Sequence, residues 1–145
     1  MIVYIDLDDT ICNYRKRYEE LRIRERTTYP QSLPNFYAFM EPIDGAIDAV
    51  QEIHMLHSMY ILTAPSPYNL HTYSGKAQWV EEYLGFEILK RLIICPNKGL
   101  LKGDILIDDR ISGYGQEYFK GRLIKFDHWI TILNELKTIA TEKRT

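Results

Sequence analysis

The chain has 145 residues, of which 46% are hydrophobic and 26% are charged, and its formal net charge at pH 7 is −2. This length supports one well-buried core rather than two ordinary domains, and the mildly acidic balance argues against binding to a nucleic-acid polymer, which needs a basic surface. Two distant cysteines, Cys12 and Cys95, predict neither a disulfide framework nor a zinc site. No apolar run reaches the ~18 residues of a membrane span. We therefore expect a single cytoplasmic domain over residues 1–145 with no membrane partner.

The chain opens with an apolar, β-rich run from Ile2 to Ile5, which predicts a buried strand. Three acids follow this run: Asp6, Asp8 and Asp9. Because alternate residues of a strand share one face and lie roughly 7 Å apart, Asp6 and Asp8 are expected to point the same way. Such a pair is able to hold a cation and to flank one reacting atom. The alternative interpretation is a solvated, aspartate-rich turn.

Residues 11–42 are predicted to form an insertion beside this acidic strand end. Residues 13–28 are dense in charge and predict an exposed amphipathic helix. Its basic side chains are interleaved with acids, which favours a solvated helix face over a phosphate-binding patch. Three prolines argue against a long helix in residues 29–42. The aromatic side chains between these prolines either close a small core or cover a ligand: Phe36, Tyr37 and Phe39.

A helix and a second strand are expected after the insertion. Asp44 is a suitable N-cap for a helix whose apolar stripe runs to about residue 57. Residues 59–62 form an apolar run that predicts a strand. This strand ends in Thr63, which places a hydroxyl group at its carboxyl end.

The next helix is predicted from residue 74 to residue 84, with Gly85 as its C-terminal stop. Lys76 lies in the first turn of this predicted helix. A lysine there opposes the positive end of the helix dipole, which prefers anions. Lys76 therefore either points to solvent or is held in place for another purpose.

The last third of the chain repeats the pattern of the opening strand. Residues 104–108 are apolar in the middle and predict a strand that ends in Asp108 and Asp109. The other expected elements here are a strand at 92–95, a basic turn at 97–103, a last strand at 122–126 and a terminal helix at 127–137.

Strands that alternate with helices across short connections indicate an α/β protein. We predict a Rossmann-like, three-layer α/β/α arrangement with a mainly parallel sheet, helices on both faces and a small helical cap insertion at 11–42. In open sheets of this kind ligands bind outside the carboxyl ends of the strands. The polar strand ends are expected to converge there, with Lys76 on a neighbouring helix: Asp6 and Asp8, Thr63, and Asp108 and Asp109.

The chemistry of these side chains indicates phosphoryl transfer. Carboxylates gathered in one crevice repel one another unless a cation compensates their charge, and all-oxygen ligation with few protein ligands favours Mg²⁺. With the metal bound, Asp6 is suited to attack phosphorus and give an aspartyl-phosphate that water hydrolyses. Asp8 is suited to act as the acid and base. The Thr63 hydroxyl and the Lys76 charge are suited to bind the oxygens of the transferred phosphoryl group.

Four ordered motifs resemble those of the haloacid dehalogenase superfamily of phosphotransferases: Asp6-Leu7-Asp8-Asp9-Thr10, Thr63 after an apolar strand, Lys76, and Gly103-Asp104-x-x-x-Asp108-Asp109. More narrowly, four segments are similar to the 5'(3')-deoxyribonucleotidases: residues 39–46, 63–66, 75–85 and 103–110. The similarity extends over most of residues 39–137 and over the opening strand.

This resemblance implies roles for individual residues. Asp6 would be the nucleophile and a metal ligand, and Asp8 the acid/base and a ligand through its backbone carbonyl. Asp108 would be the third protein ligand of magnesium and Asp109 would lie behind it, with the choice between the two left open. The candidate metal ligands are thus Asp6, Asp8, Asp108 and Asp109, and the candidate substrate-binding residues are Thr63, Lys76, Phe36, Tyr37 and Phe39.

The chain departs from the family pattern in two places. Family members carry a larger helical cap, which encloses the base and the sugar, where this chain has only residues 11–42. Ala64 stands where a hydroxyl residue often follows the motif threonine. The reduced cap leaves the phosphoryl-transfer residues intact and bears on nucleotide specificity.

The leading hypothesis is a Mg²⁺-dependent phosphomonoesterase that hydrolyses nucleoside monophosphates, with 5'(3')-deoxyribonucleotides as the expected class, through an aspartyl-phosphate. One alternative is a phosphatase of another small phosphate ester, such as a sugar phosphate. Another is a non-catalytic phosphate-binding module, which is disfavoured because both a nucleophile and an acid/base are present. We also consider a homodimer in which a second subunit completes the small cap.

Overall fold

A single five-stranded sheet organises the computed structural model, which describes residues 1–144. All its strand pairs are parallel, and the strand order is β3-β2-β1-β4-β5, so β1 lies at the centre between β2 and β4. The parallel sheet is confirmed, and the five predicted strands agree with the structure to within one residue at each end. The strands are β1 (Ile2–Ile5), β2 (Ser58–Thr63), β3 (Leu92–Ile94), β4 (Ile105–Asp108) and β5 (Arg122–Lys125).

The α-helices differ from the predicted ones mainly at their ends. They are α1 (Tyr14–Arg24), α2 (Ala46–Leu56), α3 (Thr72–Leu84), α4 (Phe86–Leu89) and α5 (Trp129–Arg144). The predicted N-cap at Asp44 is wrong, because Gly45 in the left-handed conformation caps α2 with its backbone alone. The terminal helix runs well past residue 137, because its buried stripe continues from Leu136 to Ile139. Gly85 does end α3, as predicted.

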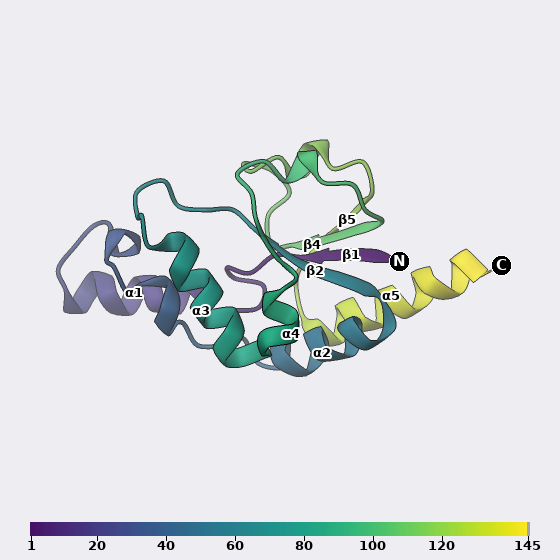
Figure 1. Cartoon of the computed structure of the whole chain (residues 1–145), viewed down its shortest axis with the longest axis horizontal. Coiled ribbons are helices and arrows are strands. Elements are labelled where there is room, and N and C mark those ends of the chain that lie inside the picture. Colours follow the sequence, from purple (N-terminus) through teal and green to yellow (C-terminus); the bar gives the residue numbers. More distant parts are fainter. Residues whose placement is uncertain (145) are drawn as a thin grey trace.

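Alternate residues of the strands face two apolar clusters of unequal size. In β1, Val3 and Ile5 belong to the larger cluster and Tyr4 to the smaller one. In Figure 1, α2, α4 and α5 lie together on one side of the strands, and the connections that lead into β4 and β5 loop over the other side. The helices contribute many buried side chains to the larger cluster, among them Val50, Ile53, Trp79, Ile88, Ile132 and Leu136.

The second face of the sheet carries a thinner layer than the expected one. Tyr4, Leu62 and Leu106 pack there with Phe119, whose ring meets the Tyr4 ring edge-on at a centroid distance of 6.0 Å. The covering segments hold only the short 3-10 helices η3 (Lys98–Leu100) and η4 (Gln116–Tyr118). A crossover between parallel strands usually needs a dozen or more residues to include a helix. The β3 to β4 connection is shorter than that. The α/β class is confirmed, but the expected α-helices on both faces are not observed in residues 1–144, where the α-helices cover one face of the sheet.

Residues 11–42 fold against α3 as short helical pieces. They comprise α1 and the 3-10 helices η1 (Pro30–Ser32) and η2 (Tyr37–Phe39). The Trp79 indole in α3 donates a 2.6 Å hydrogen bond to the Met40 carbonyl. At Gly75 the two segments approach so closely that an added Cβ would lie 2.9 Å from the Tyr37 Cβ. Figure 1 shows α1 beside α3, at the end of the molecule away from the amino terminus. Within residues 1–144, no helix is both long and apolar enough to span a membrane.

Candidate active site

The carboxyl ends of β1, β2 and β4 open into one pocket with a volume of about 180 Å³. The convergence of the predicted polar strand ends is therefore observed, as expected for parallel strands that share an edge. The lining includes a group of polar side chains: Asp6, Asp8, Thr63, Lys98, Asp108 and Asp109. The tyrosines of the lining, together with Gln31, form its aromatic wall: Tyr14, Tyr37, Tyr68 and Tyr114.

Asp6 lies directly after the central strand and is held in place by hydrogen bonds. Its backbone N–H donates to the Ile107 carbonyl at 2.9 Å, which extends the pairing of β1 with β4. One carboxylate oxygen accepts from Lys98 Nζ at 2.7 Å and the other from the Thr10 hydroxyl at 3.2 Å. Burial is the largest single influence and would raise the pKa of Asp6, but the Lys98 charge, the hydrogen bonds from Asp109 and Lys98 and the Lys76 charge together lower it below the ordinary value. Asp6 is thus a buried, ionised carboxylate.

Lys98 bridges two carboxylates and is the principal site residue that the sequence interpretation missed. Its ammonium group lies 2.7 Å from Asp6 and 2.6 Å from Asp108, and only 2% of its side chain is exposed. Burial would lower the pKa of Lys98, but the two carboxylates raise it above its ordinary value. The sequence places Lys98 only in a basic turn at 97–103. The strand-end rule that identifies Asp6, Thr63 and Asp108 also applies to Lys98, because it lies shortly after β3.

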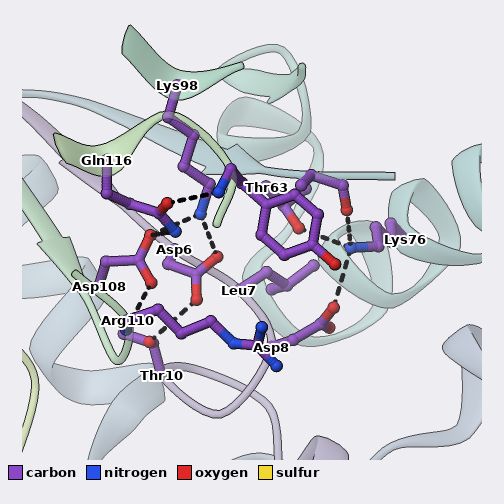
Figure 2. A network of polar contacts seen from close by, with 12 residues as sticks. Asp6, Leu7, Asp8, Thr10, Thr63, Lys76, Lys98, Asp108, Arg110 and Gln116 are labelled. Carbon is purple, nitrogen blue, oxygen red and sulfur yellow. Dashed lines mark hydrogen bonds and ion pairs between the residues drawn. The ribbon is translucent and has the colours of Figure 1, made fainter. Parts of the chain in front are cut away.

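Lys76 reaches the same region from α3. Its Nζ donates to the Thr63 hydroxyl at 2.6 Å, the Ala64 carbonyl at 2.7 Å and Asp8 at 3.0 Å. The Tyr37 ring lies over it at 5.1 Å. The helix begins at Thr72 rather than residue 74, so Lys76 lies beyond the first turn, where the opposition of the helix dipole is weaker. Figure 2 shows Lys76 and Lys98 entering from different elements to meet Asp8 and Asp6.

Asp108 and Asp109 lie beside Asp6 at the end of β4. One carboxylate oxygen from each of the three residues lies within 4.8 Å of the others, a grouping that suits a metal ion. Burial, followed by the nearby Asp6 carboxylate, raises the pKa of Asp108. Burial together with Asp6 and Asp108 raises the pKa of Asp109 to about 8. The three carboxylates therefore disfavour simultaneous ionisation unless a further positive charge joins them, so the residues fit a divalent cation.

The Asp8 side chain lies apart from this acidic cluster. One of its oxygens accepts from Lys76, as described, and the other lies 3.5 Å from the Cys12 thiol. About 25% of the Asp8 side chain is exposed, in the pocket. Asp9 turns the chain with a φ of 59°, a left-handed value that an aspartate adopts more readily than most residues. This turn leaves Asp6 and Asp8 on the pocket while their side chains meet different lysines.

The three aromatic residues predicted to bind substrate have different positions. Tyr37 lines the pocket, Phe36 is fully buried in the larger cluster, and Phe39 is 59% exposed and outside the pocket lining. Other residues of the pocket wall lie far apart in the sequence, and no spacing rule joins them: Tyr14, Gln31, Tyr68, Arg110 and Tyr114.

Comparisons with known proteins identify the family of the chain and agree with its fold. A family model described as "5' nucleotidase, deoxy (Pyrimidine), cytosolic type C protein" matches residues 24–135. A Vibrio phage KVP40 protein described as "Putative 5'(3')-deoxyribonucleotidase" is 34% identical over 93% of this chain and 84% of its own. The human cytosolic 5'(3')-deoxyribonucleotidase is 36% identical over 71% of this chain and 53% of its own length.

Among solved structures, a "putative haloacid dehalogenase-like hydrolase" of Burkholderia xenovorans superimposes with a TM-score of 0.51 at 15% identity. That similarity covers 86% of this chain and 80% of the other one, and at 15% sequence identity it supports the fold alone.

Proposed function

Because the chain belongs to the family of cytosolic type C 5'-deoxyribonucleotidases, we propose that it is a phosphomonoesterase that hydrolyses nucleoside monophosphates, with deoxyribonucleotides as its preferred class. The observation that carries the proposal is the pairing of two buried lysines with two strand-end aspartates, Lys98 with Asp6 and Lys76 with Asp8. A pocket that only bound phosphate would gain nothing from buried carboxylates, which repel anions.

Asp6 acts as the nucleophile in this proposal. It lies at the end of the central strand with its carboxylate ionised beside Lys98, so an oxygen lone pair is available to attack phosphorus. The P–O bond to the leaving alcohol breaks as the Asp6–P bond forms. Water then attacks the aspartyl-phosphate, the acyl-phosphate P–O bond breaks, and inorganic phosphate and the Asp6 carboxylate are released.

Asp8 moves the protons in the proposed reaction. When protonated it gives its proton to the departing alcohol oxygen, and it later takes a proton from the attacking water. Lys76 supports this role by fixing one carboxylate oxygen at 3.0 Å, while the partly exposed carboxylate stays in the pocket. Thr63 and the two lysines provide hydrogen-bond donors and positive charge for the phosphoryl oxygens. Lys98 thereby joins the phosphoryl-binding residues that were expected from the sequence.

Asp6, Asp108 and Asp109 would hold the divalent cation, and the Asp8 backbone carbonyl would be a further ligand, as the family resemblance implies. We propose Mg²⁺, because the donors are all oxygens and few in number, which leaves positions for water and a substrate phosphate. When bound, the ion supplies charge that stabilises the phosphoryl oxygens in the transition state.

The aromatic wall of the pocket is the proposed position of the nucleoside. Tyr14, Tyr37, Tyr68 and Tyr114 all line the pocket that also holds the aspartates. Flat aromatic rings offer large contact areas to a base, at a low entropic cost. This wall takes the place of the larger family cap, with Tyr14 and Tyr37 from residues 11–42 and the other two from loops of the sheet domain.

Phosphate release from dTMP, dUMP, UMP, AMP and two sugar phosphates tests the proposal, each measured with Mg²⁺ and with chelator. We expect Mg²⁺-dependent release that is fastest for the deoxynucleotides. Asp6→Asn should abolish turnover without changing the circular dichroism spectrum, whereas Glu82→Gln, an exposed acid near the C-terminal end of α3 and outside the pocket lining, should leave turnover intact. Retained turnover in Asp6→Asn would contradict the nucleophile. Equal release across the panel would instead favour a general phosphatase of small esters.

A further inference from the structure

Gln116 is a buried polar residue that connects a backbone turn to the acidic cluster. It lies in η4 with 1% of its surface exposed, and its amide oxygen accepts from the Tyr114 backbone N–H at 2.8 Å. A backbone N–H only donates, so this contact fixes which end of the amide is oxygen. The NH₂ group must then face the other way, where it donates to Asp108 at 3.2 Å.

Asp108 is consequently held from three directions. Lys98 at 2.6 Å and Gln116 donate to the same carboxylate oxygen, and the Arg110 backbone N–H donates to the other oxygen at 3.0 Å. Figure 2 shows Gln116 and Lys98 together above Asp108, with Asp6 on the other side of the lysine. Because Lys98 is shared between Asp108 and Asp6, it does not by itself fix the rotation of the Asp108 carboxylate. Gln116 supplies that constraint without adding a charge.

Lys98 and Gln116, whose side chains both donate to Asp108, come from two turns that are hydrogen-bonded to each other. The Lys98 backbone N–H donates to the Tyr114 carbonyl at 2.6 Å. Gly115 has a φ of 87°, and a Cβ at this position would collide with the Asn97 side chain. The turn that carries Gln116 is therefore built against the turn that carries Lys98, and a displacement of one is transmitted to the other.

We propose that Gln116 is a positioning residue that holds Asp108 in the orientation a divalent cation requires. The inference rests on the proposed function for its metal, and it deepens that function by assigning a residue outside the carboxylate set. Without the amide, Asp108 is free to rotate toward the ion pair with Lys98, and its oxygen turns away from the other two carboxylates. Partners of this kind behind a metal ligand typically affect metal affinity by about 10- to 100-fold.

Direct titration with Mn²⁺ or Mg²⁺ alone, by calorimetry and without substrate, tests this inference. Gln116→Met keeps the length of the side chain but removes the donor, and we expect its metal Kd to rise about tenfold. Activity should recover at saturating metal, because the nucleophile and the acid/base are untouched. Glu117→Gln, in the same short helix but without contact to Asp108, is the matched control and should keep the wild-type Kd.

A second variant distinguishes the loss of the contact with Asp108 from a folding defect in the turn. Gln116→Glu keeps an oxygen that accepts from the Tyr114 N–H, so the turn is retained, but it faces Asp108 with a carboxylate. We expect a weaker metal affinity here as well, although charge alone predicts a tighter one. Unchanged affinity in Gln116→Met or tighter affinity in Gln116→Glu, with the wild type binding metal normally, overturns the inference and leaves the proposed function intact. Failure of the wild type to bind either metal overturns both.

Discussion

The two buried lysines differ in the carboxylates that they hold. Lys98 bridges Asp6 and Asp108, while Lys76 joins Asp8 to Thr63. A buried lysine is stable only when its charge is paired and its donors are satisfied. The nucleophile and the acid/base of the proposed reaction are therefore paired directly with different lysines, Asp6 with Lys98 and Asp8 with Lys76.

Replacement of Lys98 should destabilise the fold, because the carboxylates of Asp6 and Asp108 would then repel each other without a shared cation. In Lys98→Met, Asp6 and Asp108 lose their shared cation, and breaking a buried pair in this way costs about 3 to 5 kcal/mol. We expect the melting temperature of the metal-free variant to fall by many degrees. Mg²⁺ should restore part of the loss, because it supplies the missing positive charge, and so should raise the melting temperature more in the variant than in the wild type.

Differential scanning calorimetry with and without Mg²⁺ measures both effects. Lys102→Met, an exposed lysine in the same connection, is the matched control and should change neither the melting temperature nor its response to the metal. An equal response to Mg²⁺ in Lys98→Met and the wild type would argue against a metal near these two carboxylates.

At the scale of elements, the attachment of residues 11–42 to α3 determines the position of the pocket wall. Three contacts connect the segments: the Trp79 to Met40 hydrogen bond, the Tyr37 ring over Lys76 and the close approach at Gly75. In addition, the buried Asn69 amide donates to two carbonyls of this segment, those of Gln31 and Leu33, at 3.0 and 2.9 Å. Residues 11–42 thus rest on the helix that also carries Lys76.

Gly75→Ala should separate these two elements. The new Cβ would lie 2.9 Å from the Tyr37 Cβ, and overpacking of this kind costs about 1 to 3 kcal/mol. The gain in helix propensity, about 0.5 to 1 kcal/mol, is smaller. We expect a lower free energy of unfolding and a higher KM, because Tyr37 lines the pocket.

Urea denaturation and substrate titration measure these two quantities for Gly75→Ala. Gln78→Ala, an exposed position in the same helix, is the control for propensity alone and should leave KM unchanged. A Gly75→Ala protein that is more stable than the wild type, with the same KM, would show that the contact with Tyr37 does not restrain the pocket wall.

At the scale of the whole molecule, the sheet is covered by α-helices on one face and by loops with short 3-10 helices on the other. The site lies where both layers end, so it receives Lys76 from the helical layer and Lys98 from the thin one. The opposite end of the sheet brings the beginning of the chain and the end of α5 together, near His57 (Figure 1).

His57 makes the stability of the whole chain depend on pH. Burial, the amino terminus and Arg144 lower its pKa below the ordinary value of 6.5. The unfolded chain therefore takes up a proton there more readily, so the stability contributed by the neutral form is present above pH 6.5 and is lost as the pH falls through the lowered pKa. The raised pKa of Asp109 acts in the opposite direction over this range, so the His57 contribution is measured as a difference. We expect the free energy of unfolding of the wild type to fall relative to that of His57→Gln between about pH 7 and about pH 5.

Urea denaturation at several pH values measures this slope. The difference in free energy of unfolding between the wild type and His57→Gln should shrink as the pH falls, because only the wild type takes up the extra proton on unfolding. His128→Gln, at an exposed position, is the matched control. An identical slope in His57→Gln and the wild type would contradict the assignment to this residue.

Local patterns determined much of this protein. Short apolar runs specify the strands, and the helices between β1, β2 and β3 indicate a parallel sheet. Parallel strands place their carboxyl ends at one edge, so acids and a threonine after β1, β2 and β4 had to gather there. This prediction uses only the local sequence around each strand end, and it was sufficient to place Asp6, Thr63 and Asp108 in one site.

Only the tertiary structure decided which lysine meets which aspartate and which aromatic rings face the pocket. Lys76 and Lys98 both follow polar or loop segments, and their partners depend on the path of the chain over opposite faces of the sheet. Phe36 and Tyr37 are neighbours in sequence, yet one is buried in the core and the other lines the pocket. Such contacts join residues tens of positions apart in the sequence. They depend on how side chains fit together in shape and charge, which a local sequence pattern does not determine.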